Sequence, residues 1–141
     1  MKQEKLILSW DDIRATIWSL IEQLQNEPIE KIVGISRGGL IPGVMLSHRL
    51  GCDFEPLVWQ TRDFKAQGWG RLHKIKQEDQ SKVMFVDDIC DSGLTIQQIR
   101  QLVPSSRWTV LYSKMDDNYV DFTGKRLYND SRWVIFPWEK Q

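Results

Sequence analysis

A short apolar strand followed by a polar turn and an amphipathic helix occurs twice in this chain. The first copy contains the run KIVGI at Lys31–Ile35 and a helical pattern that ends before Gly51. The second contains KVMFV at Lys82–Val86, a polar turn at Asp87–Gly93, and a helical pattern that continues to Pro104. Because helices that alternate with strands in this way connect parallel strands, the pattern predicts an α/β fold with a mostly parallel central sheet flanked by helices.

The segments around these two units predict further elements. They are a helix from Ile13 to Leu24 that begins near Ser9 and Asp12, strands at Phe54–Trp59, Trp108–Tyr112 and Trp133–Phe136, and a strand pair at Val120–Thr123 and Arg126–Tyr128 that turns at Gly124. The segment 61–80 differs, since it is polar and has no sustained apolar period. A polar stretch of this length inside a small domain predicts a flexible lid loop or a disordered insert.

The composition excludes several classes of protein. A length of 141 residues fits one domain, and 41% hydrophobic with 27% charged residues is typical of a globular chain. Lys and Arg (19) balance Asp and Glu (19), so the net charge offers no basic footprint for nucleic acids or anionic membranes. Cys52 and Cys90 are too few for a disulfide framework, which favours a reducing, cytoplasmic setting. No apolar stretch approaches the roughly 18 residues that a membrane span needs.

The segment Asp87–Thr95, with the sequence DDICDSGLT, carries the most chemistry in the chain. Two adjacent carboxylates follow an apolar strand, a third comes three residues later, and Ser-Gly-Leu-Thr opens a helix. Backbone N–H groups at the amino end of a helix bind anions, and Gly93 allows a ligand to approach closely. Carboxylates beside a bound phosphate would repel it unless they meet hydroxyl groups and a divalent cation. The pattern therefore indicates a sugar phosphate. The alternative is that the acids merely end a strand and cap a helix.

Two segments resemble the type I phosphoribosyltransferases, which use 5-phosphoribosyl 1-pyrophosphate (PRPP). Asp87–Thr95 is similar to their PRPP-binding motif, with Ser92 where Thr is commoner. The loop that begins Ser36-Arg37-Gly38-Gly39 and ends at Gly43 resembles the pyrophosphate loop of the xanthine–guanine, or 6-oxopurine, members. The resemblance covers residues 32–43, 83–114 and 133–139 in the right order. It implies a single-domain type I phosphoribosyltransferase fold over residues 1–141, with a lid loop at 61–80 and a small base-binding hood at 115–141.

The resemblance implies roles at the phosphate end of the site. The 5′-phosphate would bind to the turn formed by Asp91, Ser92, Gly93, Leu94 and Thr95. Pyrophosphate would bind to the loop formed by Ser36, Arg37, Gly38 and Gly39, where a non-proline cis peptide between Ser36 and Arg37 is expected. Asp87 and Asp88 would hold the ribose hydroxyls and Mg²⁺, in part through water. Arg71 in the lid is a candidate to reach pyrophosphate.

The resemblance also implies roles at the base end. Asp91 would accept a proton from purine N7, or share one with it, as N9 attacks C1′. Lys114 would donate to a 6-oxo group and repel the exocyclic amine of adenine. Trp133 would stack on the purine, and backbone carbonyls near Val134 and Glu139 would recognise a 2-substituent. In the family an acidic residue near Glu139, commonly Asp, helps to hold a metal, which makes Glu139 a weaker candidate ligand.

These expectations combine into one predicted reaction and two alternatives. The chain is expected to transfer phosphoribose from PRPP to guanine, xanthine or hypoxanthine with Mg²⁺ as cofactor, giving a nucleoside monophosphate and pyrophosphate. Its expected partners are PRPP, the purine base or nucleotide, and copies of itself in a dimer or tetramer, with no nucleic acid and no membrane. The alternatives are a PRPP- or nucleotide-binding regulator of the same fold, and a phosphoribosyltransferase that acts on a different base.

Overall fold

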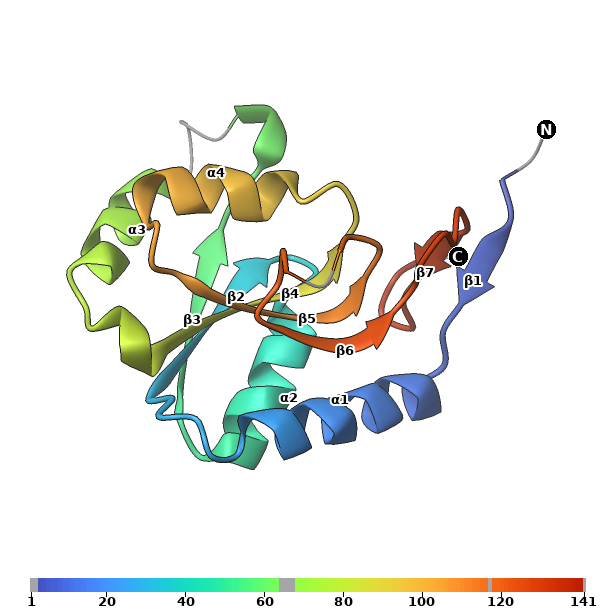
Figure 1. Ribbon diagram of the computed structural model, residues 1–141, viewed down its shortest axis with the longest axis horizontal. Helices are drawn as coiled ribbons and strands as arrows, with labels where there is room; N and C mark the ends of the chain where they lie inside the picture. The colour runs from blue at the N-terminus through green and yellow to red at the C-terminus, as the bar shows by residue number, and fades with distance from the viewer. Residues whose placement is uncertain (1–2, 64–67, 117, 141) are drawn as a thin grey trace.

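A parallel sheet forms the centre of the computed structural model, which describes residues 3–63, 68–116 and 118–140 (Figure 1). In these ranges its five strands have the order β3-β2-β4-β5-β6, and every neighbouring pair is parallel. The strands are β2 (Lys31–Ser36), β3 (Asp53–Val58), β4 (Val83–Cys90), β5 (Arg107–Ser113) and β6 (Phe122–Arg126). The predicted α/β fold with a parallel central sheet is therefore confirmed.

Helices cover both faces of the sheet. Figure 1 shows α1 (Trp10–Leu24) and α2 (Leu40–Leu50) below it, and α3 (Trp69–Lys76) and α4 (Leu94–Leu102) above it. Successive residues of a strand point to opposite faces, so β4 supplies Phe85 to the core under α3 and α4, and Met84 to the core over α1 and α2. Both faces are buried, which is why the central strands have nearly continuous apolar sequences.

The start of α1 follows the prediction from Ser9 and Asp12. The Ser9 hydroxyl accepts a hydrogen bond from the Asp12 N–H, and the Asp12 carboxylate accepts one from the Ser9 N–H, which together form a capping box. These two hydrogen bonds lower the pKa of Asp12 below its ordinary value. Beyond the cap, Ile13, Ile17 and Leu20 are buried against the sheet.

The strand pair predicted around Gly124 is wrong. Residues Phe122–Arg126 form one continuous strand, β6, which runs parallel to β5 and passes through Gly124 without a turn. A Cβ atom at Gly124 would lie 2.3 Å from Cγ2 of Thr16 on α1. The glycine therefore allows α1 to approach the sheet edge closely, a use of glycine in a strand that a turn prediction overlooks.

The segment expected to be a lid contains regular structure in its described part. The segment begins with a 3₁₀ turn (Thr61–Asp63) and continues with α3 (Trp69–Lys76). Residues 64–67 lie outside the described residues. Leu72 and Ile75 of α3 are fully buried against the sheet, and the Trp69 ring stacks on Trp59. Residues 69–76 are therefore a packed helix rather than an irregular loop, and the lid role expected of residues 61–80 stays a prediction.

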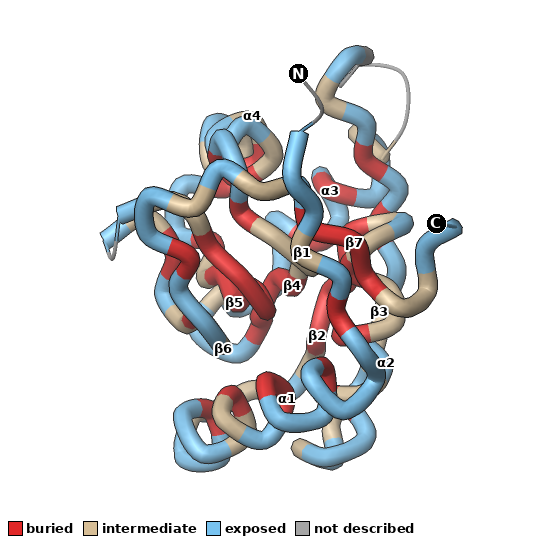
Figure 2. Tube along the Cα trace, turned by 90° about the vertical axis from the view of Figure 1, so that its right-hand side faces the viewer, coloured by how far each residue is buried: buried red, intermediate tan, exposed pale blue. Residues whose placement is uncertain are grey.

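A second, smaller sheet joins segments from near the two ends of the chain. β1 (Lys5–Ile7) pairs in parallel with β7 (Trp133–Ile135), and Leu6 is opposite Val134. Figure 2 shows the two strands side by side, and Figure 1 shows that they lie away from the central sheet. β7 was predicted, whereas β1 was not.

Among the described residues, no helix combines the length and the apolar character that crossing a membrane would require.

Candidate active site

The residues of the predicted site gather at the carboxyl ends of β2 and β4. The two strands are neighbours, with Gly34 opposite Val86, so the loops that follow them lie side by side. Asp87 and Asp88 belong to β4 rather than to the turn after it, because β4 continues its pairing with β5 as far as Cys90. The predicted turn at Asp87–Gly93 is therefore shorter and begins at Asp91.

The two aspartates of β4 face different cavities, as alternation along a strand requires. Asp87 lines a cavity of about 180 Å³, the phosphate-end cavity, together with the turn residues 91–95. Asp88 lines a cavity of about 170 Å³, the base-end cavity, and a larger one of about 620 Å³ that it shares with Arg37 and Gly38. Asp91 lines both the phosphate-end and the base-end cavity.

The turn after β4 is shaped for close approach of a ligand. Gly93 has φ +81°, a left-handed conformation that favours glycine, and α4 begins directly after it. The Leu94 N–H makes a long hydrogen bond of 3.4 Å to the Ser92 hydroxyl. Asp91 and Ser92 are exposed, and all of residues 91–95 line the phosphate-end cavity. The amino end of α4 thus borders this cavity, as an anion site requires.

The loop after β2 packs directly on β4. The peptide bond between Ser36 and Arg37 is cis, which confirms the expectation for this position. A Cβ atom on Gly39 would lie 2.3 Å from the Val86 carbonyl oxygen, and one on Gly38 would overlap the Asp88 carboxylate. The two glycines therefore bring the loop backbone and the acidic strand into contact, while the exposed Arg37 side chain lines the larger cavity.

The adjacent carboxylates are electrostatically strained. Burial, and next the charge of Asp88, raise the pKa of Asp87 well above its ordinary value. Burial also raises the pKa of Asp88, and the negative charge of Glu139 adds to this effect. The Asp88 N–H donates to Asp87 Oδ1 (2.8 Å) and the Ile89 N–H donates to Asp88 Oδ1 (2.7 Å), which only partly offset the cost. Hydroxyl donors or a divalent cation would stabilise both charged forms.

The base-end cavity brings together the residues that were assigned to the base. It is lined by Asp88, Ile89, Asp91, Lys114, Trp133, Val134, Phe136 and Glu139. Lys114 follows β5, and its Nζ donates to the Arg132 carbonyl oxygen, which holds it beside β7. The Trp133 side chain is 53% exposed at the mouth of the cavity. A cation, an aromatic face and a carboxylate thus surround one small cavity.

Comparison with known proteins decides the family. The model of the family described as Phosphoribosyl transferase domain matches residues 5–121. The chain belongs to the phosphoribosyl transferase domain family. This membership confirms the predicted class of enzyme, a phosphoribosyltransferase, and the resemblance from which it was drawn.

Relatives match this phosphoribosyltransferase over nearly its whole sequence. It is 28% identical over 139 residues to a xanthine-guanine phosphoribosyltransferase of Chromohalobacter salexigens, covering 96% of this chain and 85% of that protein. It is 29% identical over 140 residues to one of Gluconobacter oxydans, covering 94% and 83%. A crystal structure of a purine phosphoribosyltransferase from Pyrococcus horikoshii has a TM-score of 0.77 and 26% identity, covering 98% of this chain and 95% of that one.

One candidate of the phosphoribosyltransferase site lies elsewhere. Arg71 on α3 donates to Glu55 at 3.0 Å, and Glu55 also accepts a hydrogen bond from Lys31, the first residue of β2. This ion pair lies toward the amino ends of the strands, whereas Ser36 and the pyrophosphate loop lie at the carboxyl ends. The position of Arg71 therefore does not support the expectation that it reaches pyrophosphate.

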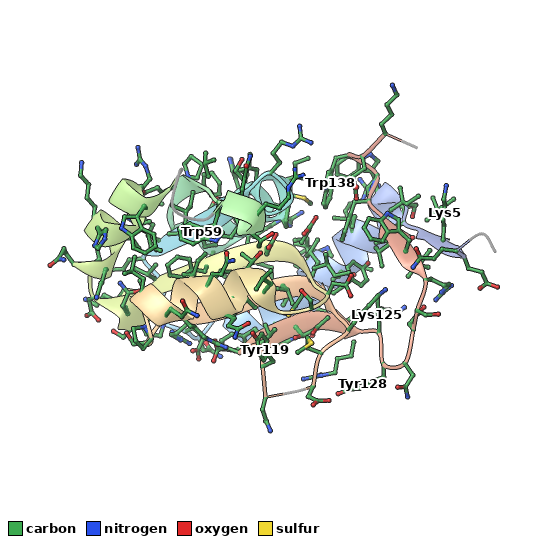
Figure 3. The ribbon with its side chains drawn as sticks, turned by 90° about the horizontal axis from the view of Figure 1, so that it is seen from above. Lys5, Trp59, Tyr119, Lys125, Tyr128 and Trp138 are labelled. Atoms are coloured by element: carbon green, nitrogen blue, oxygen red, sulfur yellow. The ribbon has the colours of Figure 1, made fainter. Side chains whose placement is uncertain are left out.

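The structure also adds residues that the sequence did not assign to this phosphoribosyltransferase site. Thr61 lines the phosphate-end cavity and, with Ser36 and Asp87, an adjoining cavity of about 290 Å³. Trp138, which is labelled in Figure 3, lines the larger cavity. Its ring stacks on Phe136 with ring centroids 4.9 Å apart. Thr61 follows the carboxyl end of β3, at the same end of the sheet as Asp87. The predicted end of that strand was therefore a sequence signal that Thr61 lies near the site. Nothing local in the sequence distinguishes Trp138 from a core aromatic.

A metal held by this phosphoribosyltransferase needs ligands from the substrate. Among the described residues, no group of three or more His, Cys, Asp or Glu side chains could hold a metal ion alone. Mg²⁺ commonly takes one or two protein carboxylates and completes its shell with water and substrate phosphates. The paired carboxylates of Asp87 and Asp88, with their raised pKa values, fit that kind of site.

Proposed function

We propose that this phosphoribosyltransferase transfers the phosphoribosyl group of PRPP to a 6-oxopurine, which is guanine, xanthine or hypoxanthine. The products are the nucleoside 5′-monophosphate and pyrophosphate. The observation that carries the proposal is the position of Asp91, which lines both the phosphate-end and the base-end cavity. A ribose that spans the two cavities would have its C1′ beside this carboxylate. The xanthine-guanine phosphoribosyltransferases among the relatives support the choice of base.

PRPP would be held at its two charged ends by the two loops. The N–H groups of residues 93–95 and the hydroxyls of Ser92 and Thr95 suit the 5′-phosphate. The Arg37 guanidinium and the N–H groups of the loop suit pyrophosphate, because arginine offers a planar fork of donors to phosphate oxygens. Asp87 and Asp88 lie between the two loops, where carboxylates accept hydrogen bonds from the ribose hydroxyls.

Mg²⁺ is the cofactor that this arrangement would use. Asp87 and Asp88 are the residues that would hold it, in part through water, and Glu139 is a further candidate because its charge already acts on Asp88. When it is bound with PRPP, Mg²⁺ would supply positive charge that stabilises pyrophosphate as the leaving group. The carboxylates of the chain would in turn favour the positive charge that develops at C1′.

The base end would select and activate a 6-oxopurine. As N9 forms a bond to C1′ and the bond from C1′ to pyrophosphate breaks, the base loses its N7 proton, and Asp91 is the carboxylate positioned to accept it. The Lys114 ammonium would donate to the 6-oxo group, whereas it would face the donor amine of adenine unfavourably. Trp133 would stack on the purine, and backbone carbonyls near Val134 and Glu139 would meet a 2-substituent.

The proposal is tested by pyrophosphate release. Purified protein, PRPP and Mg²⁺ are incubated with guanine, xanthine, hypoxanthine, adenine or uracil, and pyrophosphate is measured. We expect turnover with at least one 6-oxopurine and none with adenine or uracil. Pyrophosphate release with adenine or uracil alone would show that the accepted base is not a 6-oxopurine. Binding of PRPP without turnover of any base would favour a regulator of the same fold.

The Asp91→Asn variant tests the role of the carboxylate. We expect it to retain PRPP binding and to lose most of its turnover, because the amide keeps the size of the side chain but cannot accept the N7 proton. A collapse of PRPP affinity would reassign Asp91 to substrate binding.

Two further properties are part of this proposal. A homo-oligomer, dimer or tetramer, is supported by half-exposed apolar side chains on neighbouring helices, namely Trp10 and Trp18 on α1 and Val44 on α2. Analytical ultracentrifugation tests it, and a monomer at assay concentration would contradict it.

A cytoplasmic setting is supported by the free thiols of Cys52 and Cys90. Fractionation of cells that produce the protein tests this setting.

A further inference from the structure

Tyr119 touches the phosphate-binding turn from outside the segment 87–95. Its hydroxyl donates a hydrogen bond of 2.6 Å to the carbonyl oxygen of Gly93, which lies 26 residues earlier in the chain. Its ring occupies the space beside the Gly93 Cα, since a Cβ atom there would lie 2.6 to 2.8 Å from three atoms of the tyrosine. Tyr119 lies in the connection between β5 and β6, a segment that was expected at the base end of the site and not at the phosphate turn.

The hydrogen bond fixes the orientation of one peptide group. The Gly93 carbonyl oxygen also accepts the Gln97 N–H at 2.9 Å, the first hydrogen bond of α4. A trans peptide is planar, so the carbonyl of Gly93 and the N–H of Leu94 point in opposite directions. Two donors on the carbonyl side therefore aim the Leu94 N–H away from them, toward the side where the Ser92 hydroxyl accepts it at 3.4 Å and where Ser92 and Leu94 line the phosphate-end cavity.

Tyr119 is itself held firmly in place. Arg100 Nη1, from the last turn of α4, donates to the Tyr119 carbonyl oxygen at 2.7 Å, and its guanidinium lies 5.8 Å from the centre of the tyrosine ring. Arg100 also forms an ion pair with Asp121, whose carboxylate accepts the Trp108 N–H of β5 at 2.7 Å. The tyrosine is thus connected both to α4 and to the central sheet.

We propose that Tyr119 is a positioning residue for the phosphate turn. It holds the Gly93–Leu94 peptide in the orientation that presents the Leu94 N–H to an anion, and its ring supports the left-handed conformation of Gly93 from behind. It touches neither the base nor the ribose in this arrangement, since it lines neither cavity. The inference rests on the proposed function in one respect, which is that the anion is the 5′-phosphate of a ribose.

The Tyr119→Phe variant tests the inference because it removes the hydroxyl and keeps the ring. Calorimetry measures the affinities for GMP and for guanosine, which differ only in the 5′-phosphate. We expect the ratio of the two affinities to fall about five-fold, the usual effect of one lost hydrogen bond. The KM for PRPP should rise by a similar factor, whereas the KM for guanine should not change. An unchanged ratio, or an equal loss for GMP and guanosine, would overturn the inference.

The Tyr112→Phe variant is the matched control. The Tyr112 hydroxyl is hydrogen-bonded to Thr16 Oγ1 at 3.0 Å in the core between β5 and α1, so its removal costs stability on the face of the sheet opposite to α4. We expect a lower melting temperature with an unchanged affinity ratio. A fall in the ratio equal to that of Tyr119→Phe would show a general effect of destabilisation and overturn the inference.

A separate titration distinguishes failure of the inference from failure of the proposed function. Ribose 5-phosphate carries the phosphate without a base, so its affinity can be compared in wild type and Tyr119→Phe whatever base the enzyme accepts. We expect weaker binding to the variant by about the same five-fold factor. Equal affinities would overturn the role of Tyr119, whereas a failed assay with every purine would overturn the base assignment alone.

Discussion

A Cβ atom on Gly38 would lie 2.2 Å from Oδ2 of Asp88, so the pyrophosphate loop and the acidic strand touch with no room for a side chain between them. The same atom would also lie 2.5 Å from Cγ of that carboxylate, which means that the whole group would have to move. The loop that is expected to bind pyrophosphate and the residue that is expected to hold Mg²⁺ and ribose are therefore mechanically connected.

This contact predicts the effect of Gly38→Ala. The methyl group should displace the Asp88 carboxylate and break its hydrogen bond from the Ile89 N–H, which lowers turnover by about 100-fold, the scale of a misplacement near 1 Å. The control is Gly51→Ala, where φ is +68° and no atom lies within 4 Å of the new methyl group. That variant should lose about 1 kcal/mol of stability and keep its turnover. Steady-state kinetics and thermal unfolding check both, and wild-type turnover in Gly38→Ala would contradict the contact.

The raised pKa of Asp87 predicts a conflict between stability and activity. Its folded-state pKa lies above the ordinary value because burial and Asp88 disfavour the charged form, so the charge destabilises the ligand-free fold once the pH exceeds that ordinary value. Asp87→Asn should therefore raise the melting temperature by a few degrees at pH 7 and by much less near pH 4. Turnover should fall about 100-fold, as when a group that stabilises the transition state is removed. A lower melting temperature at pH 7 would contradict this account.

Lys114 offers a test of base selection. Methionine has a similar length and no charge, so Lys114→Met removes the donor to the 6-oxo group and the hydrogen bond to the Arg132 carbonyl. We expect kcat/KM for guanine to fall about 10- to 100-fold, the usual effect of a hydrogen bond from a charged group. Adenine should bind no worse than to wild type. Competition assays with the two bases check this, and an unchanged preference would exclude Lys114 from the site.

Two neighbouring residues of α3 test whether residues 69–76 are packed helix or mobile lid. Leu72 is fully buried, so Leu72→Ala should lower the free energy of unfolding by about 2–5 kcal/mol. Arg71 is exposed, so Arg71→Ala should change it by less than about 1 kcal/mol and leave the KM for PRPP unchanged. Urea unfolding and kinetics separate the outcomes. A negligible effect of Leu72→Ala, or a large rise of the KM in Arg71→Ala, would restore the lid interpretation.

Asp130 forms an ion pair with Arg132, the residue whose carbonyl oxygen accepts the hydrogen bond from Lys114. This ion pair predicts an unusual titration of the Asp130 carboxyl group. Hydrogen bonds from the Arg132 side chain and backbone lower the pKa of Asp130 to about 2. Because the folded-state pKa is depressed, the stabilisation is present above the ordinary value of 3.8 and is lost as the pH falls toward 2. An NMR titration of the Asp130 carboxyl carbon should therefore show its midpoint below 3, about the range given by a strong pair. A midpoint near 4 would show that the pair does not persist in solution.

Local patterns in the sequence were enough to predict β2, β3, β4 and β5 of the central sheet and to bring the turn residues 91–95 together, which line one cavity. Apolar runs gave β2 and β4, the cap at Ser9 gave the start of α1, and the turn residues 91–95 are contiguous in the chain. The end of β4 was placed too early, because polarity at Asp87 suggested a turn while the ladder with β5 keeps that residue in the strand. Hydrogen bonding between strands outweighed side-chain character there.

The elements that sequence reasoning missed depend on contacts between distant residues. β1 has three residues, and what makes it a strand is pairing with β7 at the other end of the chain. α3 buries few apolar side chains among many charged ones, so its period is weak. Tyr119 carries no signal in its own segment, because its connection to the site is a hydrogen bond to Gly93 across the fold. Such contacts are products of the tertiary structure rather than of any local pattern.

The pairing of β1 with β7 has a consequence for the order in which the parts of the site become complete during synthesis. Trp133 lies on a strand that is synthesised after the loops at the carboxyl ends of β2 and β4, whereas its partner strand β1 is synthesised before them. The loops for the sugar phosphate have by then already been synthesised. A nascent chain therefore possesses the loops proposed to hold PRPP before it possesses the wall proposed to discriminate among bases.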